Sequence, residues 1–472
     1  MSLRFYNTLT QEVELFRPLK DNVVRMYTCG PTVYNYVHIG NFRTFTFQDI
    51  LRRWLKYRGY QLNHVMNVTD VDDKIIAGAA REGKSIDDYT AVYTRAFFED
   101  AATLRLQQPE HVAPATKHIG QMVEAIEKLT AQGSTYTNDG STYFRISTFP
   151  EYGKLSHNDF GGMKSGARVD VDEYDKADAR DFVLWKARKG DEPYWDTPFG
   201  DGRPGWHIEC SAMAMAYLGE TLDIHAGGID LVFPHHENEI AQSESITGKS
   251  FARYWLHSEH LHIESQKMSK SLGNFYTLRD LLNQGYAPEA IRYLLASVPY
   301  RKKLNFTFEG LKAAAKTIER LRDFELRLTS TKLSPGRNDT ISERSGQAIR
   351  AFEEALDDDL NTAEALAAIF EYVREINSAL DAGDFREENR WDAARVLEIF
   401  DSIFDVLKPS ESGGEAVRRE GLVDSEIEKL VAERNQAKKS RDFARADAIR
   451  NQLLEQGIVL EDTKEGVRWK RK

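Results

Sequence analysis

A strand–helix–strand unit near the N-terminus constrains the fold of this chain more than any other feature. Residues 22–30, NVVRMYTCG, are rich in β-branched and aromatic types and end at a glycine, which predicts a buried strand. Residues 61–69, QLNHVMNVT, predict a second strand. Between them, helical spacing relates Phe47, Ile50, Leu51, Trp54 and Leu55, and Gly59 closes the helix. Strands joined by a helix lie parallel, so we expect a parallel α/β sheet with ligands at its carboxyl edge.

The length and composition are those of a multidomain globular protein. A chain of 472 residues is too long for one compact core, so we expect two to four domains. Hydrophobic residues make up 41% of the chain, and no apolar run is long enough to cross a bilayer. The first residues, MSLRFYNTLT, lack the apolar segment of a signal peptide. Two cysteines argue against a disulfide scaffold, so we expect a cytoplasmic protein.

The charge distribution is uneven. The net charge of −11 argues against a protein that coats nucleic acid indiscriminately. Residues 429–472 nevertheless hold twelve Lys and Arg against seven Asp and Glu, a local net charge of +5. This basic tail fits either a confined contact with a polyanion or a solvated charged helix.

Composition also indicates boundaries along the chain. Residues 1–310 form the predicted α/β domain, and the turn-rich stretch from about 114 to 205 is a predicted insertion within it. Residues 311–407 follow a helical pattern. Within that pattern, Asn361 with Glu364 three residues later resembles a capping box.

The C-terminal part predicts a linker and a small domain. Residues 408–421, KPSESGGEAVRREG, have linker composition. Residues 422–472 predict a small mixed domain, with one helix around 430–454 and a hairpin formed by GIVLEDTKEGVRW.

Four side chains are candidate metal ligands. Cys29 ends the first strand, Cys210 lies in GWHIECSAMA, and a helix that opens at Pro234 would place His235 and Glu239 on one face. Thiolates with an imidazole favour zinc over magnesium or calcium. Spacing alone does not join the three segments, and a lone cysteine is usually a buried apolar residue. The competing candidate ligands are His207, His225 and His236.

Two short motifs are candidates for phosphate binding. VHIGN, residues 37–41, lies between the first strand and its helix, where free backbone N–H groups and His38 can meet a phosphate. KMSKSLGN, residues 267–274, places Lys267 and Lys270 in a glycine-containing loop. No GxxxxGK[ST] motif is present, so an ATP-binding protein would need such a substitute. A solvent-exposed basic loop is the alternative interpretation of the second motif.

Together these segments resemble the cysteinyl-tRNA synthetase family of class I aminoacyl-tRNA synthetases. The segments that carry the resemblance, in family order, are YTCGPTVYNYVHIGN, NVTDVDDKI, GRPGWHIECSAM, HAGGIDLVFPHHENEIAQSE, KMSKSLGN and DDLNTAEAL. The likeness extends to the tail, ARADAIRNQLLEQGIVLEDTKEGVRW. It implies a Rossmann-like catalytic domain with an inserted connective domain, a helical bundle that contacts tRNA, and a small anticodon-binding domain. It also implies ATP-dependent attachment of L-cysteine to tRNA(Cys) through a cysteinyl-adenylate.

The resemblance also implies site roles. One zinc ion would be held by Cys29, Cys210, His235 and Glu239, and would recognise the substrate thiol as a soft thiolate. The residues implied to bind ATP and stabilise the transition state are His38, Gly40, Asn41, Lys267, Met268 and Lys270, with Mg²⁺ held mainly by the phosphates. The residues implied to frame the amino acid are Thr69, Trp206 and Asp230. One departure is Asn41, which stands where the general class I motif has a second histidine.

For the tail, the resemblance implies recognition of the GCA anticodon. RNA loops are read by stacking and by hydrogen bonds to base edges. Trp469 is the expected stacking residue, unless it closes a hairpin core, and Asp447, Arg450 and Asp462 are the expected base-reading residues. Lys438 and Lys439 fit contacts to backbone phosphates.

Three other functions compete with this interpretation. A cysteine ligase of mycothiol synthesis would share the catalytic core and lack the anticodon-reading tail. An inactive tRNA-binding paralogue would lose the lysine loop or the zinc ligands. A zinc hydrolase would need a general base beside the metal, and none is evident. The expected partners are therefore tRNA(Cys), ATP and L-cysteine, with no membrane, and the expected state is a monomer.

Overall fold

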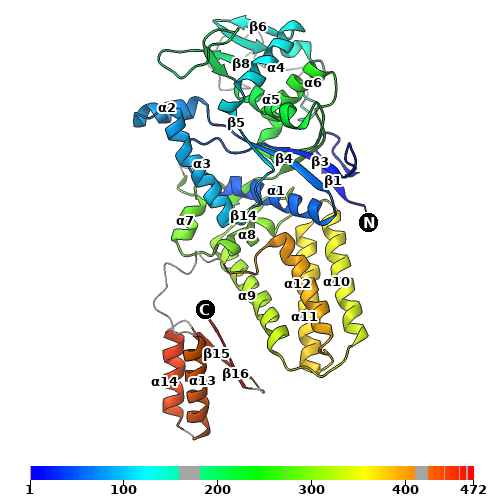
Figure 1. The fold of residues 1–472 in the computed structure, drawn as a ribbon, viewed down its shortest axis with the longest axis vertical. Helices are drawn as coiled ribbons and strands as arrows, with labels where there is room; N and C mark the ends of the chain where they lie inside the picture. Colours follow the sequence, from blue (N-terminus) through cyan, green and yellow to red (C-terminus); the bar gives the residue numbers. More distant parts are fainter. Residues whose placement is uncertain are drawn as a thin grey trace. The chain divides into compact units, whose positions relative to one another are not determined.

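The computed structural model describes residues 2–158, 181–269, 272–409, 424–440, 442–455, 458–463 and 466–471. The chain divides into two compact units, unit 1 (Met1–Pro409) and unit 2 (Ser410–Lys472). Unit 1 contains the parallel sheet, the inserted sheet and the helical bundle (Figure 1).

A five-stranded parallel sheet lies at the centre of the described part of unit 1. Its strand order is β11 (Ala252–Ser258), β10 (Leu222–Gly228), β3 (Val23–Thr28), β4 (Gln61–Val68) and β5 (His111–Pro114). Helix α1 (Ile39–Tyr57) connects β3 to β4. This confirms the predicted strand–helix–strand unit and the Rossmann-like sheet. The order of strands reverses beside β3, because β4 and β5 extend the sheet to one side and β10 and β11 to the other.

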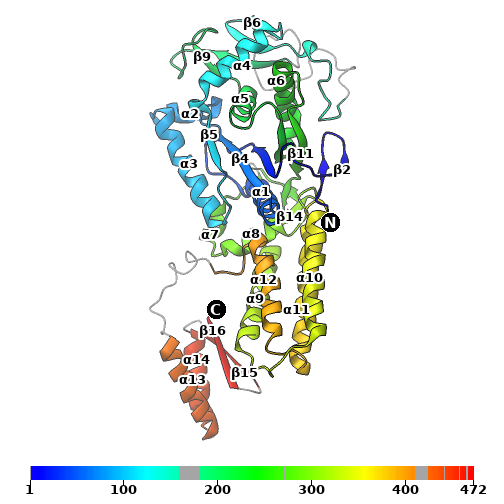
Figure 2. The ribbon, with the colours of Figure 1, turned by 45° about the vertical axis from the view of Figure 1, so that its right-hand side comes forward.

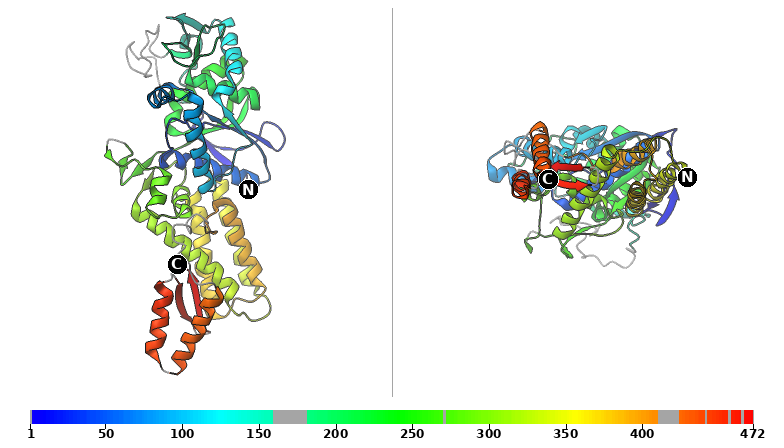
Figure 3. Two further views of the ribbon diagram at one scale, coloured as in Figure 1. Left: turned by 60° about the vertical axis from the view of Figure 1, so that its left-hand side comes forward. Right: turned by 90° about the horizontal axis from the view of Figure 1, so that it is seen from below.

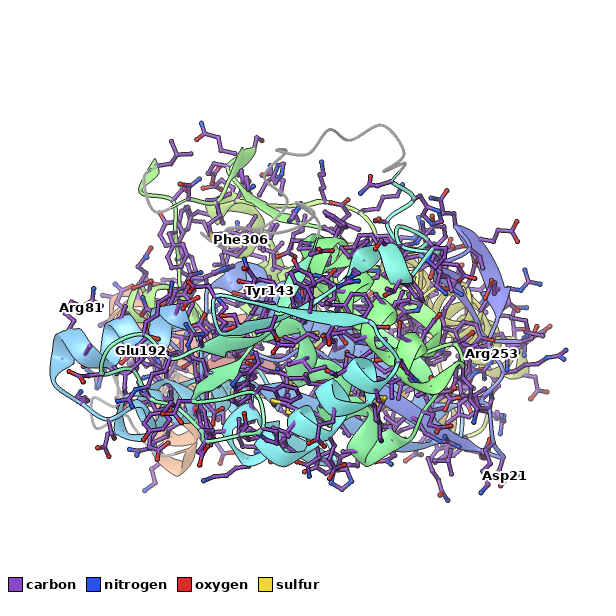
Figure 4. All side chains as sticks on the ribbon, turned by 90° about the horizontal axis from the view of Figure 1, so that it is seen from above. Asp21, Arg81, Tyr143, Glu192, Arg253 and Phe306 are labelled. Carbon is purple, nitrogen blue, oxygen red and sulfur yellow. The ribbon has the colours of Figure 1, made fainter. Side chains whose placement is uncertain are left out.

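The remaining elements of unit 1 surround this sheet. A short hairpin, β1 (Arg4–Asn7) and β2 (Glu12–Leu15), precedes it. The helices that follow β4 are α2 (Asp73–Glu82) and α3 (Ile86–Thr103). The elements that come later in the sequence of this domain are α6 (Glu237–Thr247), β12 (Leu261–Ile263), β13 (Gln266–Lys267), α7 (Leu278–Asn283), α8 (Pro288–Ala296) and β14 (Leu304–Phe306). Arg81 at the end of α2 and Arg253 on β11 lie on opposite sides of unit 1 (Figure 4).

The predicted insertion contains a sheet of its own. Its antiparallel strands, in order, are β6 (Thr135–Asn138), β7 (Ser141–Phe144), β8 (Phe182–Ala187) and β9 (Gly202–Pro204). Helix α4 (Ile119–Ala131) precedes this sheet and α5 (Trp206–Leu218) follows it. The two helices and the inserted sheet lie together above the parallel sheet (Figures 1 and 2).

Below the sheet, unit 1 ends in a helical bundle. Its helices are α9 (Phe308–Ser330), α10 (Asp339–Asp357), α11 (Thr362–Ala382) and α12 (Asn389–Phe404), which run side by side in each view (Figures 1 and 3). The Asn361 side chain caps α11 by accepting from the Glu364 amide, as the sequence predicts.

Two apolar cores flank the parallel sheet because side chains alternate along each strand. Val24 and Met26 of β3 belong to the core that continues through α1 into the bundle. Tyr27 and Cys29 belong to the second core, against α4, α5 and α6. Buried Asp49 of α1 accepts from Arg53 Nε at 2.8 Å and from Arg292 Nη2 of α8 at 2.6 Å. The helix that leaves the sheet edge is therefore fixed to its neighbours by buried ion pairs.

Unit 2 contains two helices and a hairpin within its described residues. They are α13 (Asp424–Lys439), α14 (Phe443–Glu455), β15 (Ile458–Thr463) and β16 (Gly466–Arg471). The hairpin is as predicted, but the single helix around 430–454 is wrong. Asp442 accepts from the Arg445 amide at 3.0 Å and so starts a new helix.

A second prediction concerns the start of a helix. The regular helix α6 spans Glu237–Thr247, and a short turn, η4 (Val232–His236), leads directly into it. Phe233 is the one residue of this turn with a non-helical conformation, with φ −139° and ψ 129°, as expected for the residue before a proline. The backbone is therefore helical from Pro234 onward, as predicted.

Candidate metal and nucleotide site

A cavity of about 330 Å³ opens at the carboxyl edge of the parallel sheet, where the strand order reverses. Ligands of open α/β sheets bind at this place, because the loops after the strands diverge there. Cys29 follows β3 and Gly228 ends β10, so both strands contribute to the wall. The wall also includes His38, Asn41, Lys74, Trp206, Asp230 and Phe275.

The four predicted metal ligands come together beside this cavity, and Cys29 belongs to both. Cys29 lies after β3, Cys210 on α5, His235 in the turn before α6, and Glu239 on α6. One donor atom from each residue lies within 4.8 Å of the others, and all four side chains are buried. His235 and Glu239 remain paired across the start of α6, with Nε2 and Oε1 at 3.0 Å.

The donor set fits a zinc ion. Two thiols, one imidazole and one carboxylate converge on a common centre, as in tetrahedral zinc sites. Nε2 of His235 is buried and lies 3.0 Å from Glu239 Oε1, but no aligned hydrogen bond satisfies it, which fits a cation held between these two side chains. Neither cysteine is in a disulfide.

Charge pairing sets the ionisation of three of the four ligands. Burial opposes a thiolate at Cys210, but its hydrogen bond with Cys29 and the charge of His235 outweigh burial and lower its pKa to about 6. Burial opposes a charged His235, yet Cys210 and Glu239 raise its pKa to about 10. Burial also opposes an ionised Glu239, whose pKa His225 and His235 lower to about 2. Burial and the neighbouring Cys210 and Glu239 instead raise the pKa of Cys29 well above its usual value, so Cys210 and Glu239 are the anionic donors.

A layer of histidines supports the ligands from behind. His225 Nε2 lies 2.8 Å from Glu239 Oε2, and His207 Nδ1 lies 2.9 Å from His235 Nδ1. His236 Nε2 lies 3.3 Å from the Cys29 sulfur. Such outer partners fix the orientation of ligands in metal sites.

The histidines also form an alternative donor group. Cys29, His225, His236 and Glu239 converge within the same 4.8 Å limit. However, His236 Nδ1 is bonded to His257 at 2.8 Å, and burial holds the pKa of His236 well below its usual value. We assign these histidines to the supporting layer, because the first group contains both cysteines, which are the softest donors, together with His235.

The predicted nucleotide motifs lie against each other. His38 caps α1 by accepting from the Asn41 amide through Nδ1 at 3.3 Å, and its ring packs on Phe275. A Cβ added to Gly40 would lie 2.8 Å from Met268 Cε and 2.9 Å from His38 Nδ1, so a side chain here would displace the imidazole that caps α1. Lys267 is exposed on β13, and Lys270 lies outside the described residues. Neither Gly40, Met268 nor Lys267 belongs to the described cavity wall.

Two of the three predicted amino-acid residues reach the cavity. The Trp206 ring stacks on His235 with centroids 4.0 Å apart, and Asp230 lies in the wall. Thr69 is not part of the described wall. It is buried, and its hydroxyl donates to Glu209 Oε2 at 3.2 Å. Thr69 therefore contacts a buried carboxyl group instead of the cavity, because its position after β4 turns it towards α5.

Sequence reasoning missed several residues of the cavity wall. Tyr34 and Asn35 lie in the loop between β3 and α1, and Lys74 lies on α2 with its ammonium 5.0 Å from the Tyr34 ring centroid. All three fall inside segments that carry the family resemblance, YTCGPTVYNYVHIGN and NVTDVDDKI. That overlap is the one feature of the sequence that points to them.

The predicted anticodon residues lie in unit 2. Asp447 and Arg450 are exposed and three residues apart on α14. Asp462 of β15 pairs with Val467 of β16, and its side chain lies outside the described residues. Trp469 is half-buried and packs against the small core of unit 2, which includes Ile449, Leu453 and Leu460. It therefore closes the hairpin core, the alternative that the sequence left open.

Comparison with known families gives three matches along the chain. Residues 15–316 match the family described as tRNA synthetases class I (C) catalytic domain. Residues 351–408 match the DALR domain, and residues 421–469 match the cysteinyl-tRNA ligase anticodon binding domain.

Comparison with individual proteins agrees along the whole chain. The chain is 66% identical to the cysteine–tRNA ligase of Solibacter usitatus over 472 residues, which is 100% of both chains. It is 49% identical to the cysteine–tRNA ligase of Chlamydia pneumoniae, over 98% of this chain and 97% of that one. A solved structure of Mycobacterium tuberculosis methionyl-tRNA synthetase in complex with methionyl-adenylate superposes with a TM-score of 0.64. That superposition covers 86% of this chain and 95% of the other at 15% identity, so it supports the fold.

Proposed function

The chain belongs to the cysteinyl-tRNA synthetase family, and from this premise we propose how its residues perform the reaction. The chain is a class I aminoacyl-tRNA synthetase that attaches L-cysteine to tRNA(Cys) with ATP. The observation that carries the assignment of the site is the convergence of Cys29, Cys210, His235 and Glu239 beside the cavity, whose wall includes Cys29.

We assign thiol selection to these four ligands. The zinc ion they would hold supplies a soft Lewis acid that favours the thiolate of cysteine over the hydroxyl of serine. Apolar pockets discriminate poorly between side chains of similar shape, so a cysteine enzyme gains from a metal ligand set. Trp206 covers the His235 imidazole and so excludes water from one side of the ligands.

In the first step, the cysteine carboxylate attacks the α-phosphate of ATP, which gives cysteinyl-adenylate and pyrophosphate. His38 accepts from the Asn41 amide through Nδ1, so in the neutral ring Nε2 carries the proton and can donate to phosphate oxygens. Lys267 and Lys270 neutralise the charge that spreads over the phosphates. Mg²⁺ accompanies ATP and is held mainly by its phosphates. Asp230 faces the amino group of cysteine, and Thr69 acts indirectly, through Glu209.

In the second step, a hydroxyl of the terminal adenosine of the tRNA, the 2′ hydroxyl in class I enzymes, attacks the carbonyl carbon of cysteinyl-adenylate. The acyl–phosphate bond breaks, which gives cysteinyl-tRNA and releases AMP. Unit 2 reads the anticodon, and its basic composition supports contact with RNA. Asp447 and Arg450 are exposed on one helix and available to bases, whereas Trp469 supports the hairpin. The domain limits at residues 310, 407 and 421, the monomeric state and the cytoplasmic location stay predictions. Among the described residues, no helix is both long and apolar enough to span a membrane.

The rival functions are less well supported. A mycothiol-type cysteine ligase would be expected to lack the anticodon-binding segment, but residues 421–469 match it. An inactive paralogue would be expected to lose metal ligands, but all four are present and converge.

Exchange of pyrophosphate into ATP tests the proposal. We expect exchange with cysteine, and at least about a hundredfold slower exchange with serine, because a hydroxyl is a harder ligand than a thiol and ionises far less readily. Metal analysis should give one zinc per chain. Equal exchange rates with the two amino acids would contradict the assigned role of the ligands, and no exchange with cysteine would contradict the activity itself.

A further inference from the structure

A buried tyrosine beneath the metal ligands has no part in the function described so far. Tyr27 lies on β3, two residues before Cys29 and on the same face of the strand. Its side chain is completely buried. Its ring packs against His225 with centroids 5.3 Å apart, and His225 Nε2 holds Glu239. Tyr27 and His225 are neighbours in the sheet register, so both project under the ligand cluster.

Among the described residues, the Tyr27 hydroxyl makes no well-aligned hydrogen bond, and the Cys210 sulfur is the neighbouring group with which it can pair. Buried polar groups are nearly always partnered, so this hydroxyl needs a good acceptor. The charges of Cys210, Cys29 and Glu239 also act on it. A neutral thiol is a weak acceptor, whereas a thiolate is a strong one.

The supporting layer shows which of these groups needs the hydroxyl. His236 contacts Cys29, His207 contacts His235, and His225 contacts Glu239. Among the described residues, Cys210 is the ligand for which no histidine serves in this way; its own hydrogen bonds go to the fellow ligands Cys29 and His235. The Tyr27 hydroxyl is a buried donor that can serve Cys210 in this way.

We propose that Tyr27 donates its hydroxyl hydrogen to the thiolate of Cys210 when zinc is bound. This inference rests on the zinc site of the proposed function. The hydrogen bond would draw electron density from the Cys210 sulfur, and the ion would then attract the substrate sulfur more strongly. Tyr27 is thus a positioning residue that acts through Cys210 and does not touch the substrate.

The substitution Tyr27→Phe removes the hydroxyl and keeps the ring that packs on His225. We expect zinc binding, measured by competition with a chelator, to weaken about tenfold, as for other outer partners of metal ligands. In the cobalt-substituted protein, we expect the thiolate-to-cobalt absorption band to move to longer wavelength, because a thiolate without its hydrogen bond releases electrons more readily. Tyr143→Phe, in the inserted sheet, is the matched control and should change neither quantity.

The outcomes separate the inference from the proposed function. Weaker zinc binding together with a shifted band supports the hydrogen bond. An unshifted band overturns it, whether or not zinc binding weakens, because a loss of packing alone does not alter the electrons on the sulfur. A wild-type protein that binds no zinc and gives no thiolate–cobalt band would instead refute the zinc site itself.

Discussion

At the scale of single residues, the ligand cluster is defined by mutual stabilisation. Cys210, His235 and Glu239 are buried, and each holds its charge because the others are beside it. An isolated buried charge would be neutralised by a shift of its pKa. Removal of one of these side chains therefore deletes its own contacts and also destabilises the charges of the other ligands.

Cys210→Ser tests the cluster at this scale. Serine replaces a soft sulfur with a hard oxygen that ionises far less readily, so we expect at least about a hundredfold weaker zinc binding. The measurement is zinc content after dialysis against a chelator. Met215→Leu on the same helix is the control, and retention of zinc by the serine variant would contradict the ligand assignment.

A second prediction at residue scale concerns pH. Burial raises the pKa of Glu110, but two hydrogen bonds from Arg52, at 2.8 and 3.0 Å, outweigh it and lower the pKa to about 2. The folded protein therefore keeps this carboxylate ionised where the unfolded chain, with its usual pKa, takes up a proton. The stability from the pair is complete above about pH 5 and is lost as the pH falls towards 2.

Glu110→Gln should therefore lower the free energy of unfolding by about 1 kcal/mol at pH 7, a modest value because Glu110 is partly exposed. The difference from wild type should narrow as the pH is lowered from 5 towards 3. Urea unfolding followed by tryptophan fluorescence measures it. Glu124→Gln, at an exposed position, is the control, and a difference that does not depend on pH would exclude the ion pair as its cause.

At the scale of elements, the position of His38 depends on how helix α7 begins. Helix α7 starts at a capping box in which Thr277 accepts from the Asp280 amide and Asp280 accepts from the Thr277 amide. The strand-like pairing of His38 with Thr277, and the bond from the Ile39 amide to the Tyr276 carbonyl, join this start to α1. The cap of α7 thus supports the position of His38.

Thr277→Ala tests this link between elements. Loss of an N-cap costs about 1 kcal/mol, which corresponds to roughly fivefold faster local opening. Hydrogen exchange of the α7 amides measures the opening. Thr277→Ser keeps the capping oxygen and should exchange as the wild type does, so equally fast exchange in both variants would argue against the cap.

At the scale of the whole molecule, catalysis and anticodon reading are assigned to separate units. Unit 1 contains both large apolar cores and the entire cavity. Unit 2 has a small core of its own, formed by residues such as Ile427, Val431 and Leu453. Each unit therefore has the buried surface that independent folding requires.

Truncation after Pro409 tests this division. We expect cysteine-dependent pyrophosphate exchange to stay within about twofold of wild type, since the cavity lies wholly in unit 1. We expect kcat/KM for tRNA charging to fall by at least about tenfold, because anticodon contacts are lost. Charging that is unchanged by the truncation would contradict the role of unit 2.

Local patterns of the sequence were sufficient for local structure. The alternation and helical spacing predicted β3, α1 and β4, and turn residues predicted the hairpin of unit 2. The pattern failed at the break before α14, where a cap at Asp442 decides the start of a helix. The hydroxyl of Thr69, a residue predicted to frame the amino acid, bonds to Glu209, a contact that no spacing in the sequence reveals. Its role at the amino acid stays a prediction.

The sequence by itself determined the elements, the donor types and the family. Only the tertiary structure decided that the donors meet, because Cys29 and Glu239 are 210 positions apart and spacing carries no information over such a distance. The reversal of strand order beside β3 brings the ends of β3 and β10 to one edge, and the packing of α5 and α6 places the other ligands there. The histidine layer and the Tyr27 hydroxyl are consequences of the same packing, since burial of a charged cluster requires a partner for each of its members.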